Sequence, residues 1–274
     1  MNYVQLHNDV SMPQLGFGLW QVETKDAEPA VTKALQTGYR SIDTAAIYGN
    51  EGQVGEAIAK SDIPREELFI TTKVWNSNHG YEKTLEAFEE SLIKLGTDYV
   101  DLYLIHWPTP EYDDYVETYK AMEKLQKEGK ARAIGVCNFD ISHLERLLDE
   151  CDVKPAVNQV ECHPYLAQKD IKDFCEEHGI QMEAWSPIMQ GGEVLENHYV
   201  QEIAKNHDKT GAQVILRWHL QNNRVVIPKS VTPFRIEENF DVFDFELTQN
   251  EMEKLNSLDS GTRLGPRPED MNAK

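Results

Sequence analysis

The chain has 274 residues, enough for one large α/β domain, and contains no apolar run near the ~20 residues that a membrane-spanning helix needs. We therefore expect no membrane as a partner. The formal charge of −20, from 47 acidic and 27 basic residues, repels polyanions, so we expect no nucleic acid either. The N-terminus has no signal-like stretch and the four cysteines form no C-x-x-C pair. We therefore expect a cytoplasmic protein with reduced thiols and no metal site.

The order of apolar and polar residues predicts a barrel. Residues 3–14 are expected to form a hairpin that turns at Asn8-Asp9 and closes the barrel floor. Short β-branched or apolar runs then alternate with amphipathic stretches, which is typical of parallel βα units. The eight expected strands are, in chain order, 15–18, 41–43, 68–73, 100–105, 131–136, 157–160, 181–185 and 225–227. Eight is the strand count of the closed (β/α)8, or TIM, barrel.

Helices are expected between the strands, for example over 27–38 and 113–130, where apolar residues recur at helical spacing. No linker or repeat interrupts this pattern before residues 259–274, which lose periodicity. We therefore expect a single domain over 1–274 that ends in an irregular tail at the pocket. A doubly wound sheet is the alternative, but the segment GFGLWQ lacks the third glycine of the dinucleotide-binding fingerprint and opens no helix.

Polar or aromatic residues follow nearly every expected strand, and in such barrels the carboxyl ends of the strands build the active site. These residues are Trp20, Asp43 with Tyr48, Lys73 with Trp75, His106 with Trp107, Asn138, Gln159, Trp185 with Ser186, and Lys229 with Ser230. Taken alone, each is more often a surface ion pair or a packing residue. Independent surface residues, however, have no reason to converge on one rim.

Four of these residues form a proton-transfer set: Asp43, Tyr48, Lys73 and His106. A lysine cation beside a phenol lowers the pKa of the phenol from ~10, so Tyr48 could donate a proton near neutral pH. Asp43 would hold the lysine by ion pairing, and His106 would hydrogen-bond the substrate oxygen.

Eight ordered blocks cover almost the whole chain: GFGLWQ, YRSIDTAAIYGNEGQVGEAI, LFITTKVW, VDLYLIHWP, IGVCNF, VNQVECHPY, AWSPI and IPKSVTPFRIEEN. They resemble the aldo-keto reductase superfamily, most of all its bacterial members similar to 2,5-diketo-D-gluconate reductase. The resemblance implies a metal-free, NADPH-dependent reduction of aldehydes or ketones, in which hydride passes from the nicotinamide to the carbonyl carbon. Tyr48 would protonate the oxygen, with Asp43, Lys73 and His106 completing the tetrad.

The resemblance also implies a cofactor site, with Asn138 and Gln159 at the nicotinamide carboxamide and Trp185 stacked on the nicotinamide ring. The other expected contacts are Gly18, Leu19, Ser186, Lys229, Ser230, Val231, Arg235, Glu238 and Asn239. Two cations and a hydroxyl suit the 2′-phosphate, which favours NADPH over NADH. The alternative is that the two cations only pair with acidic residues of the following helix, Glu237, Glu238 or Asp241.

Three residues depart from the commonest family pattern. Cys137 stands where family members usually have Ser, Trp185 stands where many have Tyr, and Leu19 follows Gly18. Because a thiol is a poorer donor than a hydroxyl, Cys137 is expected to weaken one hydrogen bond near the carboxamide.

Trp20, Trp75, His106 and Trp107 are expected to line the substrate pocket, an aromatic wall that suits small aldehydes, diketones, ring ketones or keto-sugars. The tail is short, so we expect an open pocket, broad substrate use, and a monomer or weak dimer. Two other functions stay open: an NADPH-binding sensor with little turnover, and a lyase or isomerase that uses Lys73 as a Schiff-base nucleophile.

Overall fold

In the computed structural model, which describes residues 2–274, eight parallel strands form one sheet in the order of the chain. They are β3 (Phe17–Gly18), β4 (Ser41–Asp43), β5 (Phe69–Val74), β6 (Val100–Ile105), β7 (Ala131–Cys137), β8 (Val157–Glu161), β9 (Gln181–Trp185) and β10 (Val225–Val226). The sheet closes because Leu15, just before β3, forms a parallel bridge to Val226, and the Gly18 N–H donates to the carbonyl of Pro228 over 3.1 Å. The predicted (β/α)8 barrel is confirmed, and every expected strand lies within two residues of its predicted bounds.

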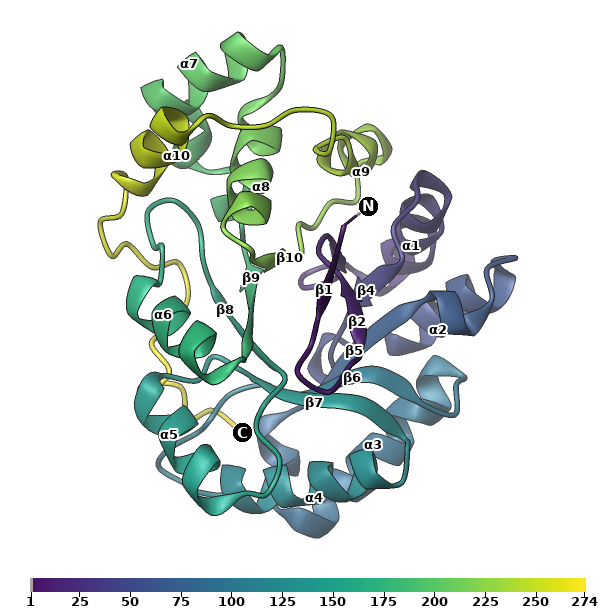
Figure 1. The fold of residues 1–274 in the computed structure, drawn as a ribbon. Coiled ribbons are helices and arrows are strands. Elements are labelled where there is room, and N and C mark those ends of the chain that lie inside the picture. The colour runs from purple at the N-terminus through teal and green to yellow at the C-terminus, as the bar shows by residue number, and fades with distance from the viewer. Residues whose placement is uncertain (1) are drawn as a thin grey trace.

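Helices surround this barrel on all sides (Figure 1). They are α1 (Thr24–Thr37), α2 (Glu51–Lys60), α3 (Tyr81–Leu95), α4 (Tyr115–Lys127), α5 (Ile141–Glu150), α6 (Lys169–His178), α7 (His198–His207), α8 (Gly211–Gln221), α9 (Pro233–Phe240) and α10 (Gln249–Asn256). The expected helices over 27–38 and 113–130 correspond to α1 and α4. Gly38 ends α1 at φ 122°, a backbone conformation that side chains rarely adopt.

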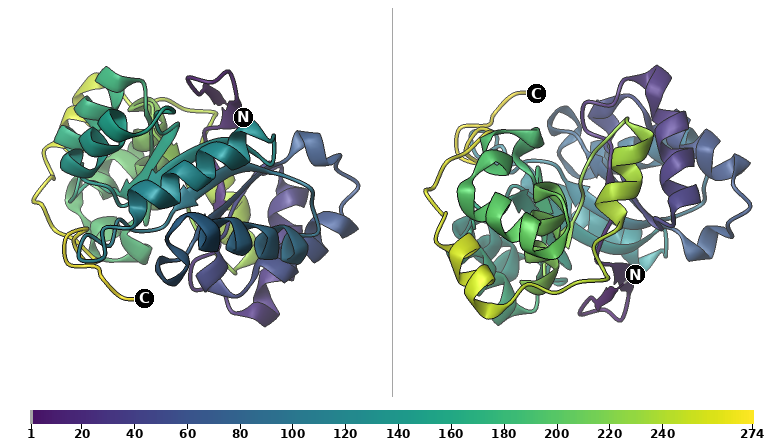
Figure 2. Two further views of the ribbon diagram at one scale, coloured as in Figure 1. Left: turned by 90° about the horizontal axis from the view of Figure 1, so that it is seen from below. Right: turned by 90° about the horizontal axis from the view of Figure 1, so that it is seen from above.

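The N-terminal hairpin closes one end of the barrel. Strands β1 (Tyr3–Gln5) and β2 (Ser11–Pro13) pair antiparallel, and the Leu6 N–H donates to the carbonyl of Val10 over 2.9 Å across the turn. Asp9 in the turn is left-handed, with φ 64°. The apolar hairpin residues Val4, Leu6, Val10 and Met12 share a buried cluster with the inward-facing strand residues. Figure 2 shows the hairpin and the C-terminus at opposite ends of the molecule. The hairpin covers its own end of the barrel, so the site can open only at the end where the C-terminus lies.

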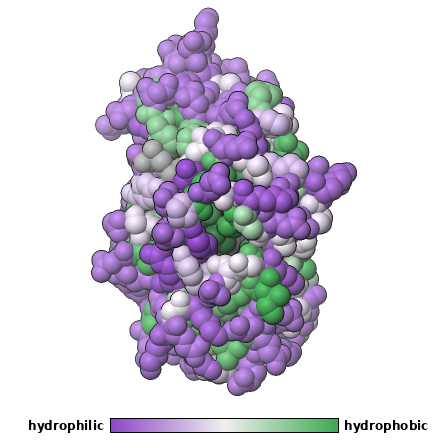
Figure 3. All heavy atoms as spheres, turned by 90° about the vertical axis from the view of Figure 1, so that its right-hand side faces the viewer, coloured by the Kyte–Doolittle hydropathy of each residue, from purple (hydrophilic) through white to green (hydrophobic). Residues whose placement is uncertain are grey.

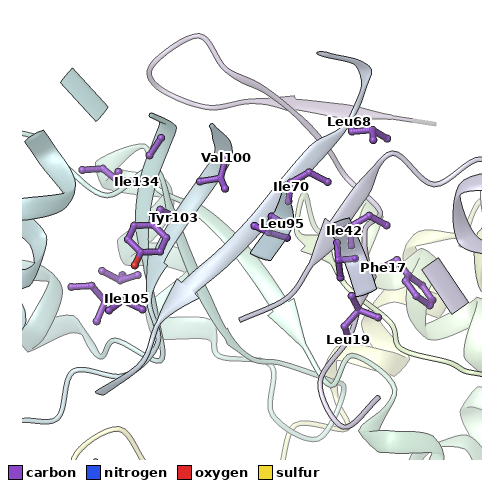
Figure 4. Close-up of a cluster of buried hydrophobic side chains, with 14 of the residues drawn as sticks. Phe17, Leu19, Ile42, Leu68, Ile70, Leu95, Val100, Tyr103, Ile105 and Ile134 are labelled. Carbon is purple, nitrogen blue, oxygen red and sulfur yellow. The ribbon is translucent and has the colours of Figure 1, made fainter. Parts of the chain in front are cut away.

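A second apolar layer lies between the strands and the helices (Figure 4). All six residues of β6 are buried, because the strand packs inward on the barrel interior and outward on helices. Tyr103 of β6 contacts Phe88 of α3 with ring centroids 4.7 Å apart. Alternation within the strands therefore decides which side chains reach the helices and which reach the barrel interior.

Polar and charged residues cover most of the face in Figure 3, and apolar side chains gather in a hollow near its middle. Within residues 2–274, no helix combines the length and the apolar character that crossing a bilayer requires.

Two glycines of α2 provide a test of helix packing. A Cβ at Gly55 would lie 2.5 Å from the carbonyl oxygen of Leu95, which ends α3, whereas nothing lies within 4 Å of a Cβ at Gly52. We expect Gly55→Ala to lower the free energy of unfolding by about 1–3 kcal/mol, because backbone would have to move. Gly52→Ala should raise it by up to about 1 kcal/mol through helix propensity. Denaturant unfolding followed by circular dichroism measures both, and equal effects would contradict this packing.

Candidate active site

The four residues of the expected proton-transfer set meet at the carboxyl ends of neighbouring strands. Asp43 ends β4, Lys73 is the last residue but one of β5, and His106 directly follows β6. Tyr48 ends a short 3-10 helix, η1 (Ala46–Tyr48), and Gly49 leaves that helix in the left-handed conformation, φ 68°. The rim predicted from the sequence therefore exists.

A buried ion pair lies at the centre of this rim. Lys73 Nζ donates to Asp43 Oδ1 over 2.6 Å and to the carbonyl of Thr44 over 3.0 Å, and both charged side chains are buried. Burial opposes the charge on Lys73, but Asp43, with smaller contributions from Tyr48 and Cys137, outweighs it and raises the pKa of the ammonium above its ordinary value. Lys73 is thus a permanent cation, which argues against the Schiff-base alternative, since a nucleophilic lysine must be neutral.

Tyr48 lies beside this cation, with Lys73 Nζ 5.3 Å from the centre of its ring. Burial raises the pKa of the Tyr48 phenol, and Lys73 lowers it by less, so the pKa lies above its ordinary value. The expectation of a lowered pKa was wrong, because burial disfavours the phenolate more strongly than one ammonium favours it. The phenol consequently stays protonated at neutral pH, the form that a proton donor requires.

His106 faces Tyr48 across the site. The two rings are 5.6 Å apart between centroids, and Trp75 packs edge-on against the other side of the imidazole at 5.2 Å. Burial, followed by the nearby charges of Lys73 and His79, lowers the pKa of His106 well below its ordinary value. The imidazole is therefore neutral near pH 7 and can direct a hydrogen bond at an oxygen without adding charge.

The residues expected at the nicotinamide carboxamide belong to the same network. Asn138, left-handed at φ 62°, donates to the carbonyl of His106 over 3.0 Å and accepts from Trp185 Nε1 over 2.8 Å. Gln159 Nε2 donates to Asp43 Oδ2 over 2.8 Å. Since an amide oxygen can accept two hydrogen bonds, both side chains keep acceptor capacity for a ligand.

Cys137, the departure from the family pattern, is buried beside these amides. Its Sγ lies 3.5 Å from Gln159 Oε1, a long contact from a weak donor. Burial raises the pKa of the thiol above its ordinary value, so it stays a thiol at neutral pH. The weakened hydrogen bond expected near the carboxamide stays a prediction.

The two cations expected at the 2′-phosphate, Lys229 and Arg235, are exposed. Across residues 2–274 neither takes part in an ion pair. The acidic residues that could have neutralised them have other partners: Lys33 pairs with Glu237, the Thr210 hydroxyl donates to Glu238, and Lys209 pairs with Asp241. The alternative of mere pairing on α9 was therefore wrong.

The segment around these cations has an unusual surface. Val231 is 43% exposed and Phe234 is 59% exposed, although both are apolar. The Thr232 N–H donates to Ser230 Oγ over 3.1 Å at the start of α9. Free cations beside exposed apolar side chains suit a ligand that joins a phosphate to an aromatic base, as NADPH does.

The other residues expected to contact the cofactor differ in how accessible their atoms are to a ligand. Leu19 is fully buried in the core and its N–H donates to the carbonyl of Asp43, so its side chain cannot touch a ligand. Gly18 lies against β10, where a Cβ would be 2.8 Å from the carbonyl oxygen of Ile227. Ser186 follows β9 at φ 47°, and Asn239 is buried in α9.

The aromatic wall is formed in part. Trp20 is 43% exposed, with its ring centroid 6.5 Å from that of Trp185, and Trp75 is half-buried against His106. Trp107 is only 7% exposed, so little of its ring is available to a substrate.

His79, which sequence reasoning missed, is buried with its Nδ1 3.2 Å from the Thr109 hydroxyl. Nothing in its sequence context, NSNHGYE, indicated that position.

The C-terminal tail lies across the same end of the barrel. The Glu161 carboxylate at the end of β8 accepts the N–H groups of Leu264 and Gly265 over 2.7 and 3.0 Å. A Cβ at Gly265 would be 2.7 Å from the ring of Trp185. Farther along, Asn76 Nδ2 donates to the carbonyl of Ala273 over 2.7 Å. We call this contact of the Glu161 carboxylate with two tail N–H groups the Glu161 clamp. Because the clamp holds backbone atoms, no pattern of side chains in the sequence could have revealed it.

The comparisons with known proteins agree with this geometry. The model of the Aldo/keto reductase family matches residues 14–260. A glyoxal reductase of Bacillus subtilis (strain 168) is 55% identical over 269 residues, which cover 98% of this chain and 96% of that protein. The methylglyoxal reductase DkgA of Escherichia coli (strain K12) is 51% identical over 267 residues, covering 97% and 96%. A Gox0644 mutant solved in complex with NADPH is 43% identical, covers 98% of each chain and has a TM-score of 0.94.

Proposed function

This chain belongs to the aldo/keto reductase family and is an NADPH-dependent reductase of carbonyl compounds, and we propose that Tyr48 is its proton donor. The observation that carries the assignment is the buried Lys73–Asp43 ion pair, 2.6 Å long, with the Tyr48 ring beside the ammonium. No other described tyrosine has this combination of a buried cation and a facing neutral histidine.

The residues around the rim fit NADPH. Asn138 and Gln159 offer amide oxygens for the carboxamide, the half-buried Trp185 offers a ring face, and Lys229 and Arg235 offer unpaired charge for the phosphate. When bound, NADPH supplies the hydride that reduces the carbonyl carbon.

Within this frame each residue of the tetrad has a distinct role. The neutral His106 orients the substrate oxygen by a hydrogen bond, and Tyr48 transfers its phenolic proton to that oxygen. Lys73 stabilises the resulting phenolate, which costs no reorganisation because Asp43 already fixes the ammonium. The Tyr48 phenol then regains its proton from solvent before the next turnover.

For the substrate we propose small 2-oxoaldehydes and related dicarbonyls. Two relatives above 50% identity are named for the reduction of glyoxal and of methylglyoxal. The partly exposed rings of Trp20 and Trp75 offer aromatic surface that suits a small planar dicarbonyl. Diketones and keto-sugars remain candidates of the same class.

The test is the oxidation of NADPH, followed by absorbance, with glyoxal, methylglyoxal, a diketone, a ring ketone and a keto-sugar. We expect kcat/KM to be highest for the 2-oxoaldehydes. Tight binding of NADPH without turnover on any of these compounds would instead support the sensor alternative.

Replacing either unpaired cation should change the choice of cofactor. In a chain with net charge −20, local cations must offset the general repulsion of a phosphate. We expect Lys229→Ala or Arg235→Ala to raise the Kd for NADPH about tenfold or more, the loss of one charge-assisted hydrogen bond, and to leave the Kd for NADH nearly unchanged. Fluorescence titration with both cofactors measures this. Lys205→Ala, an exposed lysine on α7, is the matched control, and an equal loss of NADPH affinity there would show a mere charge effect.

A further inference from the structure

A carboxyl group outside the tetrad lies buried within the same network. Glu183, in the middle of β9, is fully buried and lies directly opposite Gln159 of β8 in the sheet register. Its Oε2 accepts from Gln159 Nε2 over 2.8 Å, and its Oε1 has no hydrogen-bond partner among the residues that the structure describes. An acidic group with one partnerless oxygen is unfavourable in a barrel interior, and an apolar residue there would cost less. Stability therefore does not explain why this position carries an acid.

Gln159 connects Glu183 to the ion pair. The same amide nitrogen that donates to Glu183 also donates to Asp43 Oδ2, and the other oxygen of Asp43 accepts from Lys73. An amide nitrogen has two hydrogens, so these two acceptors use its full capacity. The chain of contacts thus runs from Glu183 through Gln159 and Asp43 to the Lys73 ammonium.

Glu183 and Asp43 together fix which end of the Gln159 amide points at the two carboxyl groups. If the amide turned over, its oxygen would face the Asp43 carboxylate and repel it. At the opposite end of the amide, the Cys137 thiol contacts the oxygen at 3.5 Å, which is too weak an interaction to hold the orientation. The two acceptors, Asp43 Oδ2 and Glu183 Oε2, therefore together hold this side chain in place.

We propose that Glu183 is a positioning residue for the reduction, acting through Gln159 to orient the Asp43 carboxylate. The inference rests on the proposed function, because it takes the tetrad as the proton-transfer machinery. Glu183 would be a fifth residue beside the tetrad, and it would act without touching substrate or cofactor.

The charge of Glu183 makes this role sensitive to pH. Burial, and then the nearby Asp43 carboxylate, raise the pKa of Glu183 to about 8. The groups that face it are Asp43, Lys73, Gln159 and Cys137, and among them only the ion pair is charged at neutral pH. Below pH 8 Glu183 is neutral and Asp43 is the single anion of the network. Above pH 8 a second negative charge enters and opposes the negative charge that develops on the substrate oxygen.

Two variants separate the acceptor from the charge. Glu183→Gln keeps an oxygen that accepts from Gln159 but cannot ionise, so we expect kcat at pH 7 within about twofold of wild type and loss of the alkaline inflection near pH 8. Glu183→Leu removes the acceptor, and we expect kcat to fall about tenfold or more while KM changes little. Glu251→Gln, a largely buried glutamate in the capping box of α10, is the matched control and should keep the wild-type profile.

A second readout does not depend on activity. Between the unfolded value of 4.5 and about 8, the folded chain holds a proton on Glu183 that the unfolded chain has released. Stability therefore falls as pH rises through this window, and the fall ends above the folded pKa. In Glu183→Gln this contribution is absent, so the difference in Tm between variant and wild type should grow from pH 5 to pH 8.5.

An alkaline inflection that persists in Glu183→Gln, or a kcat for Glu183→Leu equal to that of wild type, would overturn the proposal. A difference in Tm that does not vary with pH would also contradict it. A wild-type chain that oxidises no NADPH with any carbonyl would instead overturn the proposed function, so the two failures are distinguishable.

Discussion

Tyr48→Phe is expected to lower kcat/KM for carbonyl reduction by roughly 10²- to 10⁴-fold, the usual contribution of a positioned general acid, while the affinity for NADPH stays nearly unchanged. The substitution removes only the phenolic hydroxyl. The ring remains in place 5.6 Å from His106, and the Lys73–Asp43 ion pair remains intact. Without the hydroxyl, water must protonate the substrate oxygen, which it does without the positioning that the rim provides.

Steady-state oxidation of NADPH with methylglyoxal measures this effect, and fluorescence titration measures cofactor affinity. Tyr39→Phe is the matched control, because Tyr39 is also buried and its hydroxyl donates to the carbonyl of Ile236 over 3.3 Å, away from the rim. That control should cost some stability and leave kcat/KM near the wild-type value. Retention of wild-type kcat/KM by Tyr48→Phe would refute the assigned proton donor.

Lys73→Met is expected to lower the free energy of unfolding by about 3–5 kcal/mol, because it leaves the buried Asp43 carboxylate without its cation. Activity should fall at least as far as in Tyr48→Phe, since the phenolate left after proton transfer loses its stabilising charge. Denaturant unfolding and the NADPH assay measure the two effects separately. Lys169→Met, which breaks the exposed pair with Asp173, should change stability little.

The double variant Asp43→Asn with Lys73→Met distinguishes the loss of stability caused by the unpaired Asp43 carboxylate from the loss of activity caused by the missing ammonium. Removing both charges removes the unpaired buried anion, so most of the lost stability should return. Activity should not return, because the ammonium is still missing. A double variant as unstable as Lys73→Met alone would show that the loss came from packing and not from the unpaired charge.

The alternation of short apolar runs and amphipathic stretches was enough to predict the barrel. The short apolar run over 100–105 predicted the strand β6, whose six residues are all buried, and the residues that follow each strand predicted the rim. Asp43, Tyr48, Lys73 and His106 could be selected because strand ends of a parallel barrel all meet at one end. The connectivity of the chain and the period of the strand therefore fix which side chains meet.

What the sequence could not determine are the quantities that depend on burial and on partners far apart in the chain. The balance between burial and Lys73 decides the pKa of Tyr48, and sequence reasoning weighed only the cation. Within residues 2–274 Lys229 and Arg235 form no ion pair, whereas Lys33 and Lys209, from other segments of the chain, pair with Glu237 and Asp241.

Glu183 lies in a strand that was predicted correctly, yet its importance comes from facing Gln159 on the neighbouring strand. The clamp of Glu161 on the tail uses backbone N–H groups, which every residue but proline carries and which therefore leave no signature in the sequence. Local sequence patterns thus determined the barrel and the residues of its rim. The protonation states, the cations without ion pairs and the contacts of Glu183 and Glu161 depend on residues that are distant in the chain, so only the tertiary structure decided them.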